Sequence, residues 1–510
     1  MLAAALLPCS AAAQESLTLR DAIAMALERN RDLAVEREVA VQADAGVERA
    51  RSAYDPVFRL DGRYRDQSLP VVSVLSGAPE GELAPTTRGV SASARYTRLL
   101  PAGGTITFGT SISRETSNSL LTLISPAWFT SAGVEFRQPL LQNRRIDPAR
   151  RAIRVARLTR ERSDASMRRL VADTTAAVEQ AYWRLVAATR EVDIRRSTVE
   201  LAERQRDDVQ ARVEAGVTPE ADLAQPVAEI ERRKGELLAA IEARSRAEHA
   251  LKALILDSAE SPLWAVTLNP VDPPNMAPLP VDLQAALADA RNLRPELDDL
   301  DRRLDLQEVE IEAARDRLKP QLDLVGSYTA RGLAGGRHED IIAIPGFPSG
   351  FPDDFDGALG TSLDLLARQR FPDATAGVTL SIPLGHRAAR ADIAAAESGR
   401  RQVVSLRERL LLQIALEVRN AVVAVQTAAQ RIDAARASRE AAAIQLQAEV
   451  DRFAAGATTS FFVLTRQNEL AAAEVAEATA LAAYRQALTE LSRARGTLLR
   501  DRQVDWQTVR

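Results

Sequence analysis

The most constraining feature of this sequence is an internal duplication. The segment RVEAGVT at residues 212–218 returns as RFAAGAT at residues 452–458. Other positions return in the same order: Leu19, Ala22 and Ala26 as Leu283, Ala286 and Ala290, and Pro56, Leu60, Gly62 and Tyr64 as Pro320, Leu324, Gly326 and Tyr328. An ordered duplication predicts two similar structural repeats, residues 14–256 and 281–500, rather than several unrelated globular domains. The proline-rich residues 257–280 are expected to link them, and residues 501–510 to form a C-terminal tail.

Charge and hydropathy exclude several classes of function. Charged residues make up 27% of the chain, and the net charge is only −4. Because positive and negative residues are interspersed, no basic surface that would bind nucleic acid is expected. The sequence has no run of about 18 apolar residues, so a transmembrane helix is not expected. Such a chain can span a membrane only as a closed β-barrel, in which every backbone group is paired.

Residues 1–13 are typical of a signal peptide. An apolar run at residues 2–7 is followed by small residues at 10–13, which fit a cleavage site before Gln14. Cys9 is the only cysteine. Its lipidation is an open alternative, although Pro8 fits a lipoprotein signal poorly. Removal of the peptide would leave no thiol for a disulfide or a metal site.

Two long helices are predicted at residues 147–215 and 386–455. Apolar residues recur at heptad spacing in both: Val171, Val178, Leu185, Val192 and Val199 in the first, and Val404, Leu411, Val418, Val425 and Ile432 in the second. This is the pattern of a coiled coil, and each helix would be about 100 Å long. Shorter helices are expected at residues 19–53, 219–256, 281–317 and 459–499. Heptads alone are equally compatible with a structural scaffold.

Four segments alternate between apolar and polar residues with the period of a β-strand: residues 56–66, 131–140, 320–330 and 375–384. In the first segment, Phe58, Leu60 and Tyr64 alternate with arginine and aspartate. Strands of about ten residues with one apolar and one polar face are typical of membrane-spanning β-barrels. The alternative is that two amphipathic hairpins cover a helical core.

An insert separates the two strands of each repeat. Residues 90–113 alternate on both sides of a turn at residues 101–104, which predicts a further hairpin. The sequence leaves open whether this hairpin joins the barrel or forms an extracellular flap. The corresponding insert, residues 338–370, is rich in glycine, proline and phenylalanine and is expected to be a loop.

Four core strands in one chain cannot close a barrel. An open sheet in lipid would leave edge groups unpaired, at a cost of several kcal/mol each. Oligomerisation is therefore expected. Three copies would form a barrel of about twelve strands around a water-filled lumen, whereas two copies would form about eight, a size that side chains normally fill.

The order of helix, strand pair, long helix and shorter helix, present twice, resembles the TolC family of outer-membrane channels. The resemblance covers nearly the whole chain. It is carried by residues 17–22 (LTLRDA) with Asn30, by the strand–helix junction Gln138-Pro139-Leu140, and by the turns at residues 215–218 and 455–458. Pro383 is the copy of Pro139 in the second repeat.

This resemblance implies a mixed α and β membrane protein. It would be a homotrimer whose β-barrel lies in the lipid of the outer membrane of a Gram-negative bacterium and continues as an α-helical coiled-coil barrel in the periplasm. The implied function is a passive channel in a tripartite efflux or type I secretion system. Its partners would be a periplasmic adaptor (a membrane fusion protein) and an inner-membrane transporter, and it would catalyse no reaction and need no cofactor. A periplasmic coiled-coil scaffold or adaptor without a pore is the alternative, and the sequence does not identify the cargo.

The resemblance also assigns residues to the periplasmic tip, where adaptors would bind. These are Gly216, Val217 and Thr218 in the first repeat and Gly456, Ala457 and Thr458 in the second. The structural alternative is that the glycines only end the helices, since glycine is favoured at a helix C-terminus.

Asp222 occupies the position where the family has an aspartate that keeps the channel entrance closed. A ring of such carboxylates, one from each subunit, would favour cations. The tyrosine and arginine that such an aspartate would contact are replaced by Phe453 and Thr458. One hypothesis is therefore an apolar gate that includes Phe453, Phe461 and Phe462; the other is that these rings pack between helices.

Six arginines crowd the beginning of the first long helix: Arg144, Arg145, Arg150, Arg151, Arg154 and Arg157. Because the helix dipole disfavours positive charge there, anionic lipid headgroups or solvent are expected to offset it. The three histidines lie far apart in the sequence, which has no recognisable catalytic, phosphate-binding or metal-ligand motif. No catalytic, cofactor-binding or metal-binding residues are predicted.

Overall fold

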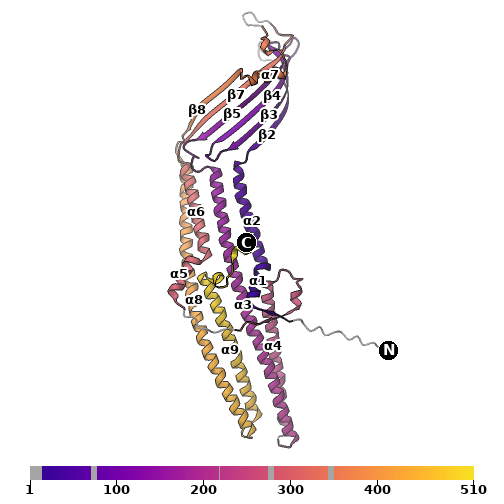
Figure 1. Ribbon diagram of the computed structural model, residues 1–510, viewed down its shortest axis with the longest axis vertical. Helices are drawn as coiled ribbons and strands as arrows, with labels where there is room; N and C mark the ends of the chain where they lie inside the picture. Colours follow the sequence, from indigo (N-terminus) through magenta and orange to yellow (C-terminus); the bar gives the residue numbers. More distant parts are fainter. Residues whose placement is uncertain (1–13, 71–76, 218, 274–280, 343–349) are drawn as a thin grey trace, which may run out of the picture. The chain divides into compact units, whose positions relative to one another are not determined.

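The structure is a computed structural model that describes residues 14–70, 77–217, 219–273, 281–342 and 350–510 (Figure 1). The predicted signal peptide with Cys9, and Thr218, lie outside the described residues. The chain forms two compact units. The sheet unit consists of Asp44–Leu158 and Leu304–Arg401; the helical unit consists of Thr159–Arg303, Gln402–Arg510 and the described residues up to Ala43. Each unit therefore contains segments of both sequence repeats.

The sheet unit is built on six antiparallel strands in the order β2-β3-β4-β5-β7-β8. Their bounds are β2 Val57–Ser68, β3 Thr86–Leu99, β4 Thr105–Ser117, β5 Ile124–Pro139, β7 Gln321–Arg337 and β8 Phe371–Ser381. Figure 1 shows them side by side. The hairpin expected at residues 90–113 is β3–β4, and it lies inside the sheet between β2 and β5. Among the described residues, the sheet thus contains the four expected core strands and the hairpin, whose place the sequence had left open.

The hairpin joins the sheet because its alternation is in register with that of the other strands. Paired residues point to the same face of a sheet. One transverse row, which is largely apolar, is Phe58, Tyr96, Phe108, Val134, Tyr328 and Ala374. The adjacent row on the other face is Arg59, Arg95, Gly109, Gly133, Thr329 and Asp373. The sheet therefore has one apolar and one polar face across all its strands.

The insert after β7 is not only the loop that its composition suggested. It contains the short helices η5 (Asp353–Phe355) and α7 (Leu359–Ala367). The buried Ser362 of α7 shares a hydrogen bond of 2.9 Å with the Thr130 hydroxyl of β5. Gly332 of β7 permits this approach, since a Cβ atom there would lie 1.9 Å from the Ser362 carbonyl oxygen. Residues 343–349 of the insert lie outside the described residues.

Each of the helices expected at residues 19–53 and 281–317 is broken in two. The first consists of α1 (Leu19–Arg29) and α2 (Arg31–Arg51), followed by η1 (Ser52–Tyr54); the second consists of α5 (Leu283–Leu293) and α6 (Pro295–Asp316). Asn30 causes the first break: its side-chain oxygen accepts hydrogen bonds from the backbone of Asp32 and Leu33. Pro295 causes the second, because proline disfavours a helical residue before it.

The long helices are α3 (Pro148–Glu214) and α8 (Arg387–Ala454). The chain returns along α4 (Ala224–Ile255), which follows η3 (Glu220–Leu223), and along α9 (Ser460–Arg495). Heptad residues in the middle of both long helices are buried: Val171, Val178 and Leu185 in α3, and Val418, Val425 and Ile432 in α8.

Helix α8 is long and apolar enough, by length and composition alone, to cross a membrane, which the sequence analysis did not expect. Within its buried segment, Glu417 forms an ion pair of 3.0 Å with Arg294 of the neighbouring polypeptide segment. A second apolar face, Leu412, Leu416 and Val423, is exposed. We therefore attribute the hydropathy of α8 to two helix-packing faces.

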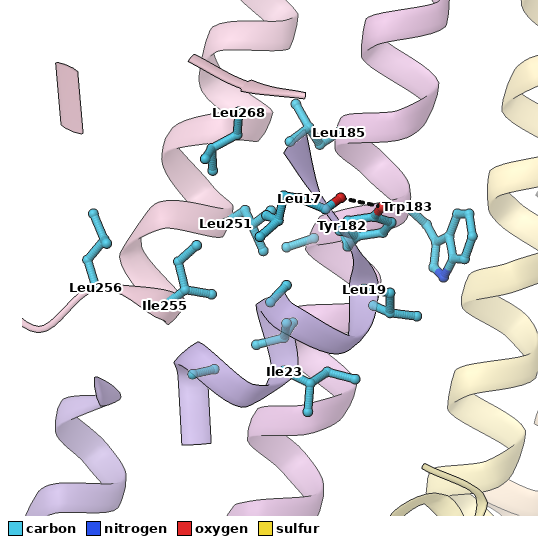
Figure 2. Packing of buried hydrophobic residues seen from close by; sticks show 14 of the residues in the cluster. Leu17, Leu19, Ile23, Tyr182, Trp183, Leu185, Leu251, Ile255, Leu256 and Leu268 are labelled. Atoms are coloured by element: carbon cyan, nitrogen blue, oxygen red, sulfur yellow. Dashed lines mark hydrogen bonds between the residues drawn. The ribbon is translucent and has the colours of Figure 1, made fainter. Parts of the chain in front are cut away.

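The core of the helical unit surrounds two short strands that the sequence analysis missed. Strand β1 (Gln14–Leu17) pairs in parallel with β6 (Thr267–Pro270), which follows η4 (Pro262–Ala265) in the predicted linker. Figure 2 shows the Tyr182 hydroxyl donating to the Leu17 carbonyl oxygen, at 3.0 Å. The hydroxyl also lies 2.7 Å from Asp272, and burial together with this hydrogen bond raises the pKa of Tyr182.

The predicted C-terminal tail is folded. It contains α11 (Trp506–Val509), and α10 (Leu498–Asp501) ends at its first residue. Val509 packs with Leu33, Met167 and Val171.

Candidate functional site: the helix turns and the polar face of the sheet

The turn between α3 and α4 begins with a glycine in the left-handed region. Gly216 has a φ of 71° and donates a backbone hydrogen bond of 2.9 Å to Val213. The Val217 N–H donates to the Arg212 carbonyl oxygen at 3.0 Å, which completes a Schellman-type helix end. Val217 is exposed, so this end of the hairpin presents an apolar side chain.

The turn between α8 and α9 has the same geometry. Gly456 has a φ of 72° and donates to Phe453, and the Ala457 N–H donates to Arg452 at 2.9 Å. Ala457 is exposed and Thr458 is half-buried. Both glycines thus end their helices in a left-handed conformation that glycine adopts without strain. This structural role does not conflict with contact to an adaptor.

Phe453 connects the two hairpins. The Arg212 guanidinium of α3 lies 4.3 Å from the centre of the Phe453 ring of α8, in a cation–π contact. The ring is half-buried. Phe453 therefore contacts the neighbouring long helix.

Phe461 and Phe462 behave differently. They lie in the first turn of α9, edge to face, with ring centres 5.5 Å apart. They are 52% and 50% exposed, whereas the following residues Val463 and Leu464 are buried. The two rings are thus not part of the core of a single chain.

Asp222 lies in η3 and is exposed. Its backbone N–H donates to Pro219 at 3.1 Å.

A buried arginine near these turns was missed by the sequence analysis. Arg233 of α4 is 1% exposed and donates to Glu229 at 2.7 Å, to the Thr198 carbonyl oxygen of α3 at 2.7 Å and to Gln467 of α9 at 3.0 Å. Asn468 of α9 donates to Glu229 at 2.8 Å. The spacing of Glu229 and Arg233 by one helical turn was the available signal, but it is common on exposed helix faces.

This network shifts the ionisation of Glu229. Burial alone would raise the pKa of its carboxyl group, but hydrogen bonds from Arg232, Asn468 and Arg233 outweigh burial and lower the pKa to about 2. The carboxylate is therefore charged at neutral pH and holds Arg233 in place.

Carboxylates of the neighbouring helix α6 offset the arginine cluster at the beginning of α3. Arg151 lies 2.6 Å from Glu310, and Arg154 lies 2.5 Å from Glu312. Arg150 pairs with Asp147. Ion pairs within the chain thus offset three of the six arginines, Arg150, Arg151 and Arg154.

The two strand–helix junctions differ in detail. Pro139 is the last residue of β5, and the N–H of the following Leu140 donates to Leu322 of β7 at 2.7 Å. Pro383 follows β8 and is exposed.

The polar face of the sheet contains a hollow of about 600 Å³. Hydroxyl and glycine residues form most of its lining: Ser93, Thr97, Thr107, Gly109, Ser111, Ser131, Gly133, Ser327, Thr329 and Thr375. Arg95 and Glu135 also line it. This lining would suit water and polar solutes, whereas the opposite face exposes Phe58, Leu60 and Tyr64.

Comparisons with known proteins agree with this architecture. Residues 286–497 match the model of a family described as outer membrane efflux protein. No curated protein sequence matches the chain.

The fold of the whole chain is that of solved outer-membrane channels. The Campylobacter jejuni CmeC outer membrane channel superposes with a TM-score of 0.63 at 17% identity, covering 94% of this chain and 86% of that one. The outer-membrane channel OprN gives 0.63 at 19% identity, with coverages of 96% and 90%. The Vibrio cholerae outer membrane protein VceC gives 0.62 at 15% identity, with coverages of 94% and 96%.

The resemblance drawn from the sequence is therefore confirmed. The predicted function as an outer-membrane efflux protein, and the predicted location in the outer membrane with a large periplasmic part, are confirmed with it. The family is one of efflux proteins, not of enzymes.

Proposed function

We propose that the chain is the passive outer-membrane channel of a tripartite export system and acts as a homotrimer. The observation that carries this proposal is the six-stranded sheet with one apolar face, one polar face and two free edges. Phe58 and Leu60 of β2 are 64% and 71% exposed on the apolar face. Such a surface suits the hydrocarbon of a membrane. It does not suit a soluble periplasmic scaffold, in which it would promote aggregation.

Sister subunits would close the sheet. Strands β2 and β8 each pair with one neighbour among the described strands. Because β2 and β8 run in opposite directions, β2 of one copy can pair antiparallel with β8 of the next and continue both faces. Three sheets of six strands would make eighteen, the number expected if the hairpin at residues 90–113 joins the barrel. Barrels of 16 to 18 strands enclose an aqueous channel.

The exposed apolar face of α8, formed by Leu412, Leu416 and Val423, would pack against a neighbouring copy. The helices of three copies would then form the periplasmic α-helical barrel. The turns at Gly216 and Gly456 would meet the periplasmic adaptor, which connects the channel to an inner-membrane transporter. The cargo and the type of transporter stay open between efflux of small molecules and type I secretion of proteins.

Phe461 and Phe462 would form an apolar constriction at the entrance, together with the exposed Asp222. Their half-exposed rings could contact those of other copies. Phe453, through its contact with Arg212, would hold the ends of α3 and α8 together beside them.

Membrane fractionation and electrophysiology test the proposal. The mature protein should be found in the outer membrane as a trimer, and it should conduct ions in planar bilayers. A soluble monomer or dimer, or a membrane trimer that never conducts, would refute it.

A further inference from the structure

The charge on the polar face of the sheet is unevenly distributed. Strand β2 has three arginines, Arg59, Arg63 and Arg65, on this face. Asp61 lies on the same face, because alternate residues of a strand point to the same side. Arg95 of β3 is directly opposite Arg59 in the register. We call these four arginines the basic stripe.

Other arginines on the same face are neutralised by neighbours. Arg137 lies 2.6 Å from Asp323, and Arg331 lies 2.8 Å from Asp373. Among the described residues, none of the four arginines of the basic stripe forms an ion pair, and all four are exposed. The remaining acidic residues of this face are Asp61 within the stripe, and Glu115 and Glu135 on β4 and β5.

Like charges directly opposite each other destabilise a pair of strands. The pairing of Arg59 with Arg95 therefore does not stabilise the folded protein. A bound anion would relieve the repulsion between the two guanidinium groups. Arg95 also lines the hollow of the polar face, where hydroxyl groups could donate further hydrogen bonds to an oxyanion.

Closure of the barrel would leave the stripe unpaired. The adjoining strand β8 of the next copy has Thr375, Gly377, Thr379 and Ser381 on its polar face, and its one acidic residue there, Asp373, is paired with Arg331. Each subunit would thus contribute one basic stripe to the lumen.

We infer that the basic stripe makes the barrel lumen a binding path for anions, so that the channel favours cargo with phosphate, sulfonate or carboxylate groups. This inference rests on the proposed channel function. Arginine suits it because its planar guanidinium binds such groups through two hydrogen bonds.

Block of the channel by inorganic tripolyphosphate tests the inference. Tripolyphosphate is added on the loop side of trimers in planar bilayers, and reversal potentials are recorded in a KCl gradient. The test variant is R59Q/R95Q. The matched control is R98Q/R114Q, which removes two arginines of β3 and β4 from the apolar face.

We expect tripolyphosphate to block the unaltered channel. The R59Q/R95Q variant should weaken this block at least about tenfold and shift the reversal potential toward the equilibrium potential of K⁺. R98Q/R114Q should behave as the unaltered channel. Equal block in both variants, or no block of a conducting unaltered channel, would overturn the inference while leaving the channel function intact. A protein that forms no channel would instead remove the proposed function.

Discussion

The Arg212 guanidinium lies 4.3 Å from the centre of the Phe453 ring and so joins the ends of the two long helices, α3 and α8. A cation–π contact at a partly exposed site contributes about 0.5–1 kcal/mol. We expect Phe453→Leu to remove this contact, to loosen the two hairpin ends and to raise the conductance of the closed channel in planar bilayers. Arg212→Gln should have the same effect, because it removes the other partner.

Phe461→Leu is a useful comparison, since Phe461 contacts no cation among the residues that the structure describes. If Phe461 forms the constriction, its substitution should raise conductance without changing thermal stability. Unchanged conductance in all three variants would argue that the narrowest point lies elsewhere.

The buried Arg233 should be the most sensitive residue of the helical unit. Arg233→Met would remove one of the three residues that donate to the Glu229 carboxylate, and the donor to the Thr198 carbonyl oxygen, in a largely buried environment. Loss of one member of a buried ion pair costs about 3–5 kcal/mol. Circular dichroism during heating should show a clear fall in the midpoint of helix unfolding.

The adjacent Arg232 provides the control. It pairs with Glu229 and Glu236 but is half exposed. Arg232→Gln should cost less than about 1 kcal/mol, as is usual for surface ion pairs. Similar midpoints for the two variants would contradict the assigned role of Arg233.

The Glu229 network should also make the stability of the folded protein depend on pH. The folded-state pKa of Glu229 is lowered from 4.5 to about 2. A group whose pKa falls on folding stabilises the folded state above its unfolded pKa and loses this contribution as the pH falls through the folded pKa. The midpoint temperature of unfolding should therefore decrease as the pH is lowered from 4.5 to 2. The Glu229→Gln variant should have a lower midpoint temperature at neutral pH and a smaller decrease over this pH range. Parallel curves of midpoint against pH for the two proteins would refute the network as the cause.

Sequence periodicity was sufficient for the long helices and for the strands of the sheet unit, because the spacing of apolar residues determines which face is buried. Val178 in α3 and Val425 in α8 are buried as their heptad positions predict. The hairpin β3–β4 was recognised, but its place in the sheet was not, since strand neighbours depend on pairing with distant residues such as Ala132 opposite Thr110.

The features that sequence analysis missed depend on single long-range contacts. Strand β6 lies in a segment whose prolines suggested only an extended linker, and its pairing with β1 joins this linker to the start of the first repeat. Helix α7 follows a stretch of glycine and proline, and Ser362 is held by Thr130 of another repeat. Arg151 and Arg154 of α3 are paired with carboxylates of α6, which gave no local signal of this contact.

The last prediction concerns Gly332, on which the docking of α7 depends. A Cβ atom at this position would lie 1.9 Å from the Ser362 carbonyl oxygen and 2.5 Å from the Thr130 hydroxyl, both in fixed positions of the sheet unit. Gly332→Val should therefore displace α7 and expose the bond after Arg368 or Arg370 to trypsin. Gly326→Ala on the same strand is the control, because the nearest atom to its Cβ would be the Thr375 carbonyl oxygen at 3.8 Å. Limited proteolysis of membrane-inserted protein should cleave the first variant at least about tenfold faster than the second, as a loss of about 1.4 kcal/mol in docking would produce. Equal cleavage rates would show that α7 tolerates the added side chain and that its position does not depend on this glycine.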